Sequence, residues 1–456
     1  MPAPHSRPAL PSPRLAALAG PLLAELLLAM GVGIVGTALA ARLSDAHGAG
    51  FALAHHVFGA LFLLFRIVGA GAGVVITQAL GAGARAEADR VARALLGAST
   101  WIGLAVALPA ALAATPMLGL MNAPPEVLPL AAPLLVALAP VLVLDAWSAS
   151  LTTVLRSHLH ARDTLAVMAV MQAVQLLLMG PLMLGWGPVP ALGLPGFALA
   201  VLLSRVLAIT LQLALWRHRL GLVPQRSDWW RWRGPELRAV ARIGLPGAAE
   251  NMAYRLAFLV SVAVVGQLGA AALATHAYAQ QVIMVVLLFG LAMGLSVEVV
   301  VGHLVGAGRL HEAHALVKRA LALGLAVSLA VATVAALLGP WTMRLFTQDT
   351  AIATAAVTLL WWTVLLEPGR TFNLVVINAL RATGDARYPV QVGAVSMAVV
   401  LAGGSWLLGD VLGLGLVGVW IAYAADEWLR GLLMWRRWVR LRWVPMARAS
   451  RRRLGH

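Results

Sequence analysis

The chain alternates between long apolar stretches and short polar ones over nearly its whole length. A helix needs about twenty apolar residues to cross the hydrocarbon core of a bilayer. Twelve stretches approach or exceed that length, at residues 15–41, 51–80, 94–115, 127–155, 164–186, 193–216, 240–268, 273–305, 320–346, 351–380, 388–409 and 412–435. The pattern predicts an all-α polytopic membrane protein with twelve transmembrane helices.

The first six stretches and the last six are related by an internal repeat, in which equivalent positions keep a constant offset in numbering. Matching pairs are Pro21 and Pro246, Glu25 and Glu250, Gly81 and Gly306, Gly83 and Gly308, Leu155 and Leu380, and Arg156 and Arg381, all at an offset of 225. Near the end the offset falls to 222, where Gly196 corresponds to Gly418. An even number of spans in each half makes the two repeats parallel, and transporters are often built from such repeats. We expect an N-lobe at 1–216, a cytoplasmic linker at 217–239 and a C-lobe at 240–456.

Composition and charge placement give the orientation. The chain is 61% hydrophobic and 11% charged, which excludes a soluble globular protein. Most of the 34 lysines and arginines lie in the termini and in loops after even-numbered spans, whereas the opposite loops carry only Arg42 and Arg344. The positive-inside rule therefore predicts cytoplasmic termini. We assign the net charge of +16 to contact with anionic lipid headgroups rather than nucleic acid.

Several motifs with enzymatic meaning are absent or out of context. Residues 31–36 match G-x-G-x-x-G, but they lie inside a predicted span, where glycines serve helix packing. His311 and His314 are three residues apart, not the four of a zinc-binding H-E-x-x-H helix. The chain has no cysteine and no P-loop. We expect no enzyme activity and no cofactor. The Ala-, Leu- and Arg-rich usage with a single lysine favours a bacterial inner membrane.

Ionisable residues inside the spans are the candidate functional residues, because they are costly there and tend to line ion or substrate pathways. The acidic ones are Glu25, Asp145, Glu250, Glu298, Glu367, Asp426 and Glu427, and the basic ones are Arg66, Arg205, Arg255, Arg370 and Arg430. Structural ion pairing is the alternative for each of them. We favour Glu250 and Glu367 as the coupling pair, with Glu25, Asp145 and Glu298 as further candidates for the coupling cation or substrate. Supporting residues are Arg255, Arg370, Tyr254 and Asn373.

Four ordered segments indicate a family. Residues 301–308 (VGHLVGAG), 345–349 (LFTQD), 380–385 (LRATGD) and 413–420 (GLGLVGVW) resemble signatures of multidrug and toxic compound extrusion (MATE) transporters. The segment 78–83 (QALGAG) repeats the first of them in the N-terminal half. This resemblance covers nearly the whole chain. It implies a two-lobed antiporter that expels organic cations in exchange for protons or sodium.

The chain departs from the family pattern at three places. Gly36 stands where many members carry an aspartate in helix one, and Gly180 replaces a second aspartate often found in helix five. Tyr254 stands where the sodium-coupled branch has a glutamate, and Glu250 lies one helical turn earlier. We therefore expect the cation site to have moved into the C-lobe.

The sequence predicts a secondary active efflux antiporter that works by alternating access. Its expected substrate is a small, cationic, amphipathic molecule, its expected coupling ion is H⁺ or Na⁺, and the protein is expected to be a monomer. If the coupling ion is Na⁺, its expected ligands are Glu250 and Glu367, and no other metal site is predicted. Two alternatives remain. The first is a lipid-linked sugar flippase, which would use Arg66, Arg255 and Arg370. The second, more remote, is a membrane-embedded transferase.

Overall fold

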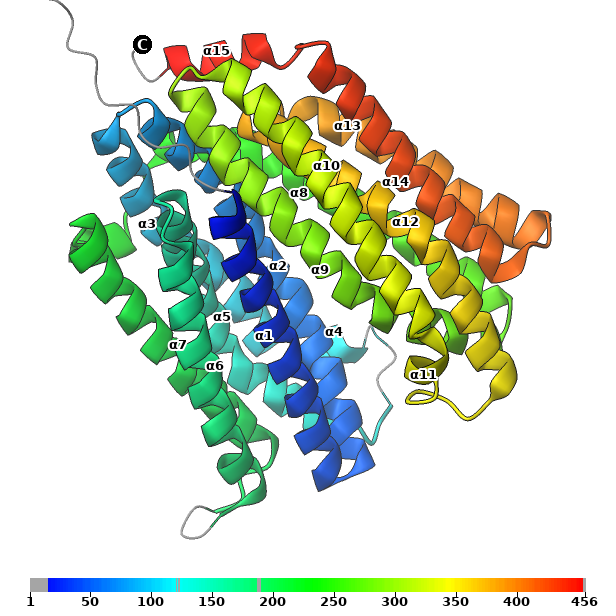
Figure 1. Cartoon of the computed structure of the whole chain (residues 1–456). Coiled ribbons are helices and arrows are strands. Elements are labelled where there is room, and N and C mark those ends of the chain that lie inside the picture. Colours follow the sequence, from blue (N-terminus) through cyan, green and yellow to red (C-terminus); the bar gives the residue numbers. More distant parts are fainter. Residues whose placement is uncertain (1–14, 120, 122–123, 187–189, 454–456) are drawn as a thin grey trace, which may run out of the picture.

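The computed structural model describes residues 15–119, 121, 124–186 and 190–453, without the side chains of residues 63, 64 and 66–68. The described residues fold almost entirely into helices that run side by side (Figure 1). In that view the helices coloured blue to green lie on the left, and most of those coloured yellow to red lie on the right.

We use N-lobe for α1 to α7 with η1, and C-lobe for α8 to α15. The N-lobe contains α1 (Leu15–Leu43), α2 (Asp45–Gly81), α3 (Arg85–Leu112), α4 (Ala114–Gly119), α5 (Leu128–Ser157), α6 (Ala161–Leu184), α7 (Leu194–Leu215) and η1 (Trp216–Leu220). A short helix, η2 (Arg226–Trp229), lies between the lobes in sequence. The C-lobe contains α8 (Gly234–Gln267), α9 (Ala270–Gly306), α10 (Leu310–Leu337), α11 (Gly339–Met343), α12 (Thr350–Ala382), α13 (Arg387–Ser396), η3 (Met397–Gly403), η4 (Ser405–Val411), α14 (Gly415–Val439) and α15 (Val444–Arg452).

Ten helical segments of the described chain are long and apolar enough to cross a membrane. Helices α2, of 37 residues, and α14, of 25 residues, bring the number to the predicted twelve. Helix α14 is less apolar because Asp426, Glu427 and Arg430 lie within it. The all-helical, twelve-span prediction is therefore confirmed.

The internal repeat is visible in the lengths of the helices. Helices α2 and α9 each have 37 residues and begin at equivalent positions of the repeat, Asp45 and Ala270. Helices α3 and α10 each have 28 residues and also begin at equivalent positions, Arg85 and Leu310. Helices α5 and α12 end one repeat apart, at Ser157 and Ala382. The two halves therefore share one framework.

Not every predicted span is one continuous α-helix. The predicted span 94–115 is interrupted, because α3 ends at Leu112 and α4 begins at Ala114. The predicted span 320–346 is interrupted, because α10 ends at Leu337 and α11 begins at Gly339 with Pro340 in its first turn. Proline has no backbone N–H to continue the preceding helix and suits the start of a new one. The predicted span 388–409 changes from α-helix to π-helix after Ser396. The apolar pattern marked the membrane crossing and missed these changes in backbone geometry.

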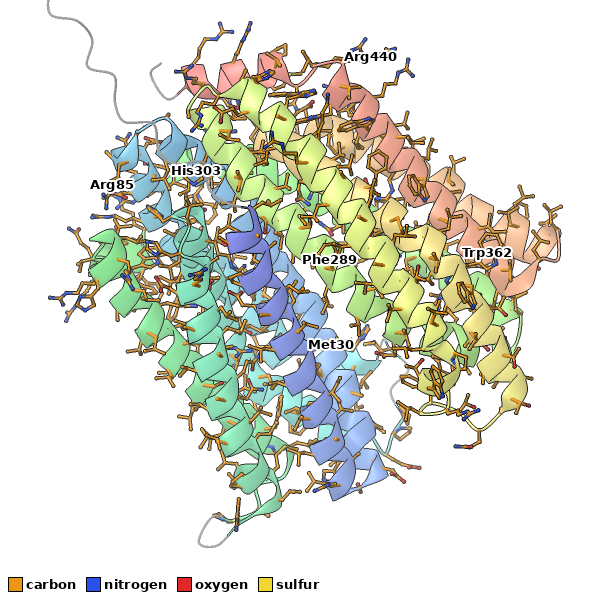
Figure 2. All side chains as sticks on the ribbon, viewed as in Figure 1. Met30, Arg85, Phe289, His303, Trp362 and Arg440 are labelled. Carbon is orange, nitrogen blue, oxygen red and sulfur yellow. The ribbon has the colours of Figure 1, made fainter. Side chains whose placement is uncertain are left out.

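The lobes meet where α1 and α2 pack against α8 and α9. We use basic end for the end of the molecule formed by loops 82–84, 158–160, 307–309 and 383–386 together with α15. Figure 2 shows Arg85, His303 and Arg440 toward this end, at the top of the view. Helix α15 docks there through Ala447, and Trp443, the residue just before the helix, is buried in the same hydrophobic core. The contacts between lobes described below lie in the half of the molecule nearest the basic end.

Candidate functional site

Five ionisable side chains form a buried group between α12 and α14. We call this group the C-lobe charge cluster, and its members are Glu367, Arg370, Asp426, Glu427 and Arg430. The guanidinium of Arg370 lies 2.6 Å from Glu367 and 3.4 Å from Glu427. The guanidinium of Arg430 lies 2.6 Å from Asp426 and 3.0 Å from Glu427. None of the five residues is more than 7% exposed, so their ion pairs are shielded from solvent.

The cluster forms because each helix presents its charges on one face. Glu367 and Arg370 are three residues apart on α12, and Glu427 and Arg430 are three apart on α14, a spacing that brings side chains together on a helix. Helices α12 and α14 pack against each other. Glu427 accepts from Arg370 as well as pairing with Arg430, so it joins the two helices.

Polar neighbours complete the cluster. The amide Nδ2 of Asn373 donates to Glu427 at 2.9 Å, and the hydroxyl of Ser396 donates to Asp426 at 2.6 Å. Tyr254, on α8, is close enough to Arg370 to interact with it electrostatically. Within the described part of the chain, the Oδ1 of the buried Asn373 has no hydrogen-bond partner.

The charges within the cluster do not balance. Three carboxylates, Glu367, Asp426 and Glu427, face two guanidinium groups, Arg370 and Arg430. An uncompensated charge in a protein interior is strongly unfavourable. With all five groups ionised, the cluster would be neutralised by one monovalent cation or one proton.

Glu250 and Glu25 occupy equivalent ion pairs. Glu250 accepts from Arg381 at 2.6 Å, which joins α8 to α12. One repeat earlier, Glu25 accepts from Arg156, which joins α1 to α5, and also from Thr164 at 2.7 Å. Both carboxylates are buried. The same buried ion pair is therefore present in both lobes.

Glu250 also borders the C-lobe charge cluster, because Arg430 interacts with it electrostatically. Glu250 and Glu367 thus approach the same cluster while pairing with different arginines, Arg381 and Arg370. Arg255 is exposed and is not among the ion-paired arginines of the described residues. The supporting role expected of Arg255 therefore rests on no ion pair with Glu250, whose partner is Arg381.

The ion pair of Asp145 with Arg205 is the N-lobe counterpart of the contact between Arg370 and Glu427 in the cluster. Arg205 donates to Asp145 at 2.7 Å, between α7 and α5. Offsets of 225 and 222 align Asp145 with Arg370 and Arg205 with Glu427. The two lobes therefore keep an ion pair at equivalent positions with the signs exchanged.

Glu298 lies at the contact between the lobes. It is buried on α9, and its carboxylate lies 4.0 Å from a Cβ placed on Gly73 of α2. Arg381 interacts with it electrostatically. The hydrogen bonds and ion pairs found among the described residues include none to Glu298. This carboxylate would meet water if α2 and α9 separated.

The two glycines that replace family aspartates have different surroundings. A Cβ placed on Gly36 would lie 3.1 Å from the ring of Phe51, 3.3 Å from Phe197 and 3.7 Å from Met179. A Cβ placed on Gly180 would meet nothing within 4 Å. Apolar side chains therefore fill the place beside Gly36 where a carboxylate would stand. This leaves that part of helix α1 without a titrating group.

Three members of the cluster were not among the residues favoured from the sequence. Asp426, Glu427 and Arg430 were recognised as charges within a span but were not chosen. The repeat contains a signal for Glu427, because the offset of 222 aligns it with Arg205. For Asp426 and Arg430 the aligned residues are Ser204 and Ala208, so the repeat gives no indication. The side chain of Arg66 lies outside the described part of the structure.

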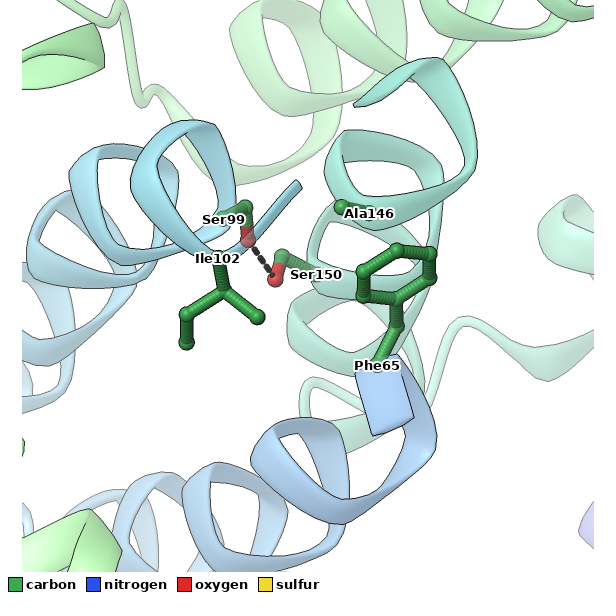
Figure 3. A pocket seen from close by; sticks show the side chains of 5 residues that line it. All are labelled: Phe65, Ser99, Ile102, Ala146 and Ser150. Carbon is green, nitrogen blue, oxygen red and sulfur yellow. Dashed lines mark hydrogen bonds between the residues drawn. The ribbon is translucent and has the colours of Figure 1, made fainter. Parts of the chain in front are cut away.

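The N-lobe holds a small gap between α3 and α5, lined by Phe65, Ser99, Ile102, Ala146 and Ser150 (Figure 3). The hydroxyls of Ser99 and Ser150 share a hydrogen bond of 2.6 Å across it. The gap is too small for a water molecule. It is a packing feature rather than a binding site. Among the described residues, no group of three His, Asp or Glu side chains is arranged to hold a metal ion.

Comparison with known proteins agrees with the two-lobed geometry. The MatE family model matches residues 21–181 and again residues 246–407. The two matches begin at Pro21 and Pro246, one repeat apart. An uncharacterized transporter of Bacillus subtilis, YisQ, is 30% identical over 432 residues, covering 95% of each chain. A probable multidrug resistance protein NorM of Bradyrhizobium diazoefficiens is 31% identical, covering 88% of this chain and 87% of its own.

Solved structures share the fold. A MATE protein in the bent conformation has a TM-score of 0.85 at 20% identity and covers 96% of both chains. An outward-facing multidrug resistance MATE transporter has a TM-score of 0.86 at 19% identity, covering 95% of this chain and 96% of its own. From the family match, the full-length relatives and the twelve-helix fold, the chain belongs to the MatE (MATE) family of multi-pass membrane transporters.

Proposed function

We propose that this protein is a secondary active antiporter that exports cationic, drug-like molecules in exchange for H⁺ or Na⁺. The observation that carries the proposal is the excess negative charge of the buried C-lobe charge cluster. The multidrug resistance names of several relatives support the substrate class.

Exchange follows from competition for one negative charge. When a proton or sodium ion neutralises the cluster, an organic cation loses its electrostatic attraction to it. When the ion leaves, the charge is restored and favours the organic cation. Burial makes neutralisation favourable, because a low dielectric disfavours an unpaired ionised carboxylate. One site can then couple two opposing fluxes without a nucleotide.

Glu367 is the carboxylate to which we assign the coupling ion. Among the residues that the structure describes, it is paired with Arg370 alone, whereas Glu427 is contacted by Arg370, Arg430 and Asn373. Because Glu367 accepts from fewer donors, its ionised form is the least stabilised of the three carboxylates in the cluster. Glu250, Tyr254 and Asn373 lie beside the cluster and are assigned supporting roles. We assign Glu298 a separate role, as a carboxylate that meets water when the lobes part.

The basic end is proposed to face the cytoplasm of a bacterial inner membrane. Its segments carry Arg309 and the basic helix α15 with Arg448, Arg451 and Arg452, and the positive-inside rule favours the cytoplasmic side for such a basic end. Anionic headgroups would contact these arginines. We propose that the protein works as a monomer.

The test is transport by purified protein in liposomes, with a proton gradient and a sodium gradient imposed separately. Export of a fluorescent organic cation under one of the two gradients is expected. No transport under either gradient would contradict antiport. Movement of a lipid-linked sugar without any gradient would favour the flippase alternative. In that alternative, Arg255 and Arg370 bind the phosphate groups of the substrate.

A further inference from the structure

Helices α2 and α9 cross at the pseudo-twofold axis that relates the lobes. Thr77 contacts Gly302, and Gly73 faces Glu298. The members of each pair are one repeat apart in sequence, at an offset of 225. A residue meets its own repeat equivalent only on a symmetry axis. The axis therefore passes between α2 and α9 in the half of the molecule nearest the basic end.

The contacts beside the axis are reciprocal. Gly81 lies against the backbone of His303, and Gly306 lies against the backbone of Gln78. Gln78 and His303 are themselves one repeat apart. In a twofold interface, if residue i of one partner touches residue j of the other, the reverse contact also occurs. The two glycines permit this close approach, because a Cβ at either would collide with the opposing backbone.

The side chains of Gln78 and His303 also make reciprocal hydrogen bonds between the lobes. The Nε2 of Gln78 donates to the carbonyl of Ala382 at 2.7 Å. The Nε2 of His303 bonds to the carbonyl of Ser157 at 2.8 Å. Ser157 and Ala382 are the last residues of α5 and α12 and are also one repeat apart. Carbonyl groups in the last turn of a helix have no partner within the helix.

We propose that Gln78 and His303 form a double latch that holds the lobes together at the basic end. They are positioning residues that set the fraction of protein molecules in which the lobes are closed at this end. The proposal deepens the proposed function and rests on it, because alternating access requires that this end open and close. Opening would break both hydrogen bonds at once, since each residue reaches from one lobe to the other.

Glutamine and histidine can make the same hydrogen bond in the two halves of the latch. Both side chains end in an N–H that can reach a carbonyl of the opposite lobe. A neutral imidazole with the proton on Nε2 donates as the glutamine amide does. A leucine of similar size would fill the space without a donor. Exchange between glutamine and histidine should therefore preserve the latch, whereas leucine should abolish it.

The experiment measures the distance between spin labels on cysteines introduced at Arg90 and Lys318. Both residues are exposed near the starts of α3 and α10, and the chain has no native cysteine to interfere. The protein is studied at full length in lipid nanodiscs, without substrate or gradient. Gln78→Leu and His303→Leu should each raise the open-to-closed ratio about twofold to tenfold, with a larger change in the double variant.

Two controls separate the latch from a general loss of packing. The swapped protein Gln78→His with His303→Gln should restore the original distance distribution. Gln212→Leu is the matched control, because Gln212 is a buried glutamine that donates to Ser148 and Thr152 within its own lobe. That variant should leave the distribution unchanged.

An unchanged distribution in folded Gln78→Leu and His303→Leu proteins would overturn the proposal. The proposal would also be overturned if the swapped protein had a shifted distance distribution and the single variants Gln78→His and His303→Gln were shifted as well. If the double variant does not fold, the single variants still decide the question. Because the distances need no transport, absence of antiport in liposomes would affect the proposed function without affecting this result.

Discussion

The N-lobe and the C-lobe share a framework and differ in what they enclose. Each lobe keeps a buried glutamate paired with an arginine, Glu25 with Arg156 and Glu250 with Arg381. At positions deeper in the bundle the lobes diverge. The repeat aligns the charged C-lobe residues Glu367, Asp426 and Arg430 with the uncharged N-lobe residues Leu142, Ser204 and Ala208.

This difference distinguishes the contacts that hold each lobe together from the charged residues that can bind an ion. At the positions equivalent to the cluster, the N-lobe keeps the balanced ion pair of Asp145 with Arg205, and it packs Phe51 and Phe197 around Gly36. The C-lobe carries a cluster with one negative charge in excess. Contacts that hold helices together persist in both repeats, whereas an unbalanced charge is costly and appears where it has a use. We infer that the C-lobe carries the coupling chemistry.

The largest expected effect comes from removing a guanidinium from the cluster. Arg370→Met would leave Glu367 with no partner and deprive Glu427 of one, so we expect a loss of about 3–5 kcal/mol of stability. Thermal unfolding in detergent measures it. Arg255→Met is the control, because Arg255 is exposed and its replacement should cost within about 0.5 kcal/mol. Equal small shifts for both variants would contradict the structural importance of the cluster.

The next effect concerns coupling rather than stability. Glu367→Gln makes the cluster neutral, so the protein should fold normally and lose gradient-driven efflux. Glu250→Gln should also lose it. A lost charge-assisted ligand costs about 1.5–3 kcal/mol, or roughly one to two decades of affinity. Efflux from proteoliposomes is the measurement.

Glu25→Gln is the matched control for Glu250→Gln, because both carboxylates pair with an equivalent arginine. The N-lobe variant should retain coupled efflux. If Glu25→Gln and Glu250→Gln both retain coupled efflux, both glutamates serve only the framework. If Glu250→Gln and Glu367→Gln both transport normally, the assignment of the coupling site to Glu250 and Glu367 is wrong.

Introducing the family aspartate into the N-lobe should destabilise the protein. Gly36→Asp would press a carboxylate against Phe51, Phe197 and Met179, and overpacking of this kind costs about 1–3 kcal/mol. Gly180→Ala is the control, because nothing lies within 4 Å of its added methyl group. Full stability of Gly36→Asp together with an altered pH profile of transport would show that the N-lobe can still take part in coupling.

The smallest effect tests whether the ion pairs of the two lobes are interchangeable. Exchanging the charges as Asp145→Arg with Arg205→Glu gives the N-lobe the C-lobe arrangement. Each single change places like charges together, and the double change restores a pair. We expect a coupling energy of about 0.5–3 kcal/mol in a double-mutant cycle by thermal unfolding. Additive losses would mean that the orientation of the pair matters as well as its presence.

Much of the fold could be predicted from sequence because the information is local or periodic. Membrane spans follow from the length of apolar runs, and the constant offset that relates Glu25 to Glu250 reveals the two lobes directly. The ionisable residues that build the cluster could be recognised as charges within spans. Their partners could not, because Arg370 and Glu427 are 57 residues apart and meet only when α12 and α14 pack.

The sequence by itself therefore determined the membrane class, the repeat and the family, since bilayer thickness and residue order suffice for these. The tertiary structure decided which charges pair and what remains unpaired. Arg255 was expected to support the site, but the structure turns Glu250 toward Arg381 and leaves Arg255 exposed. The latch of Gln78 and His303 likewise exists only where two lobes meet, because its bonds join residues separated by 304 and 146 positions.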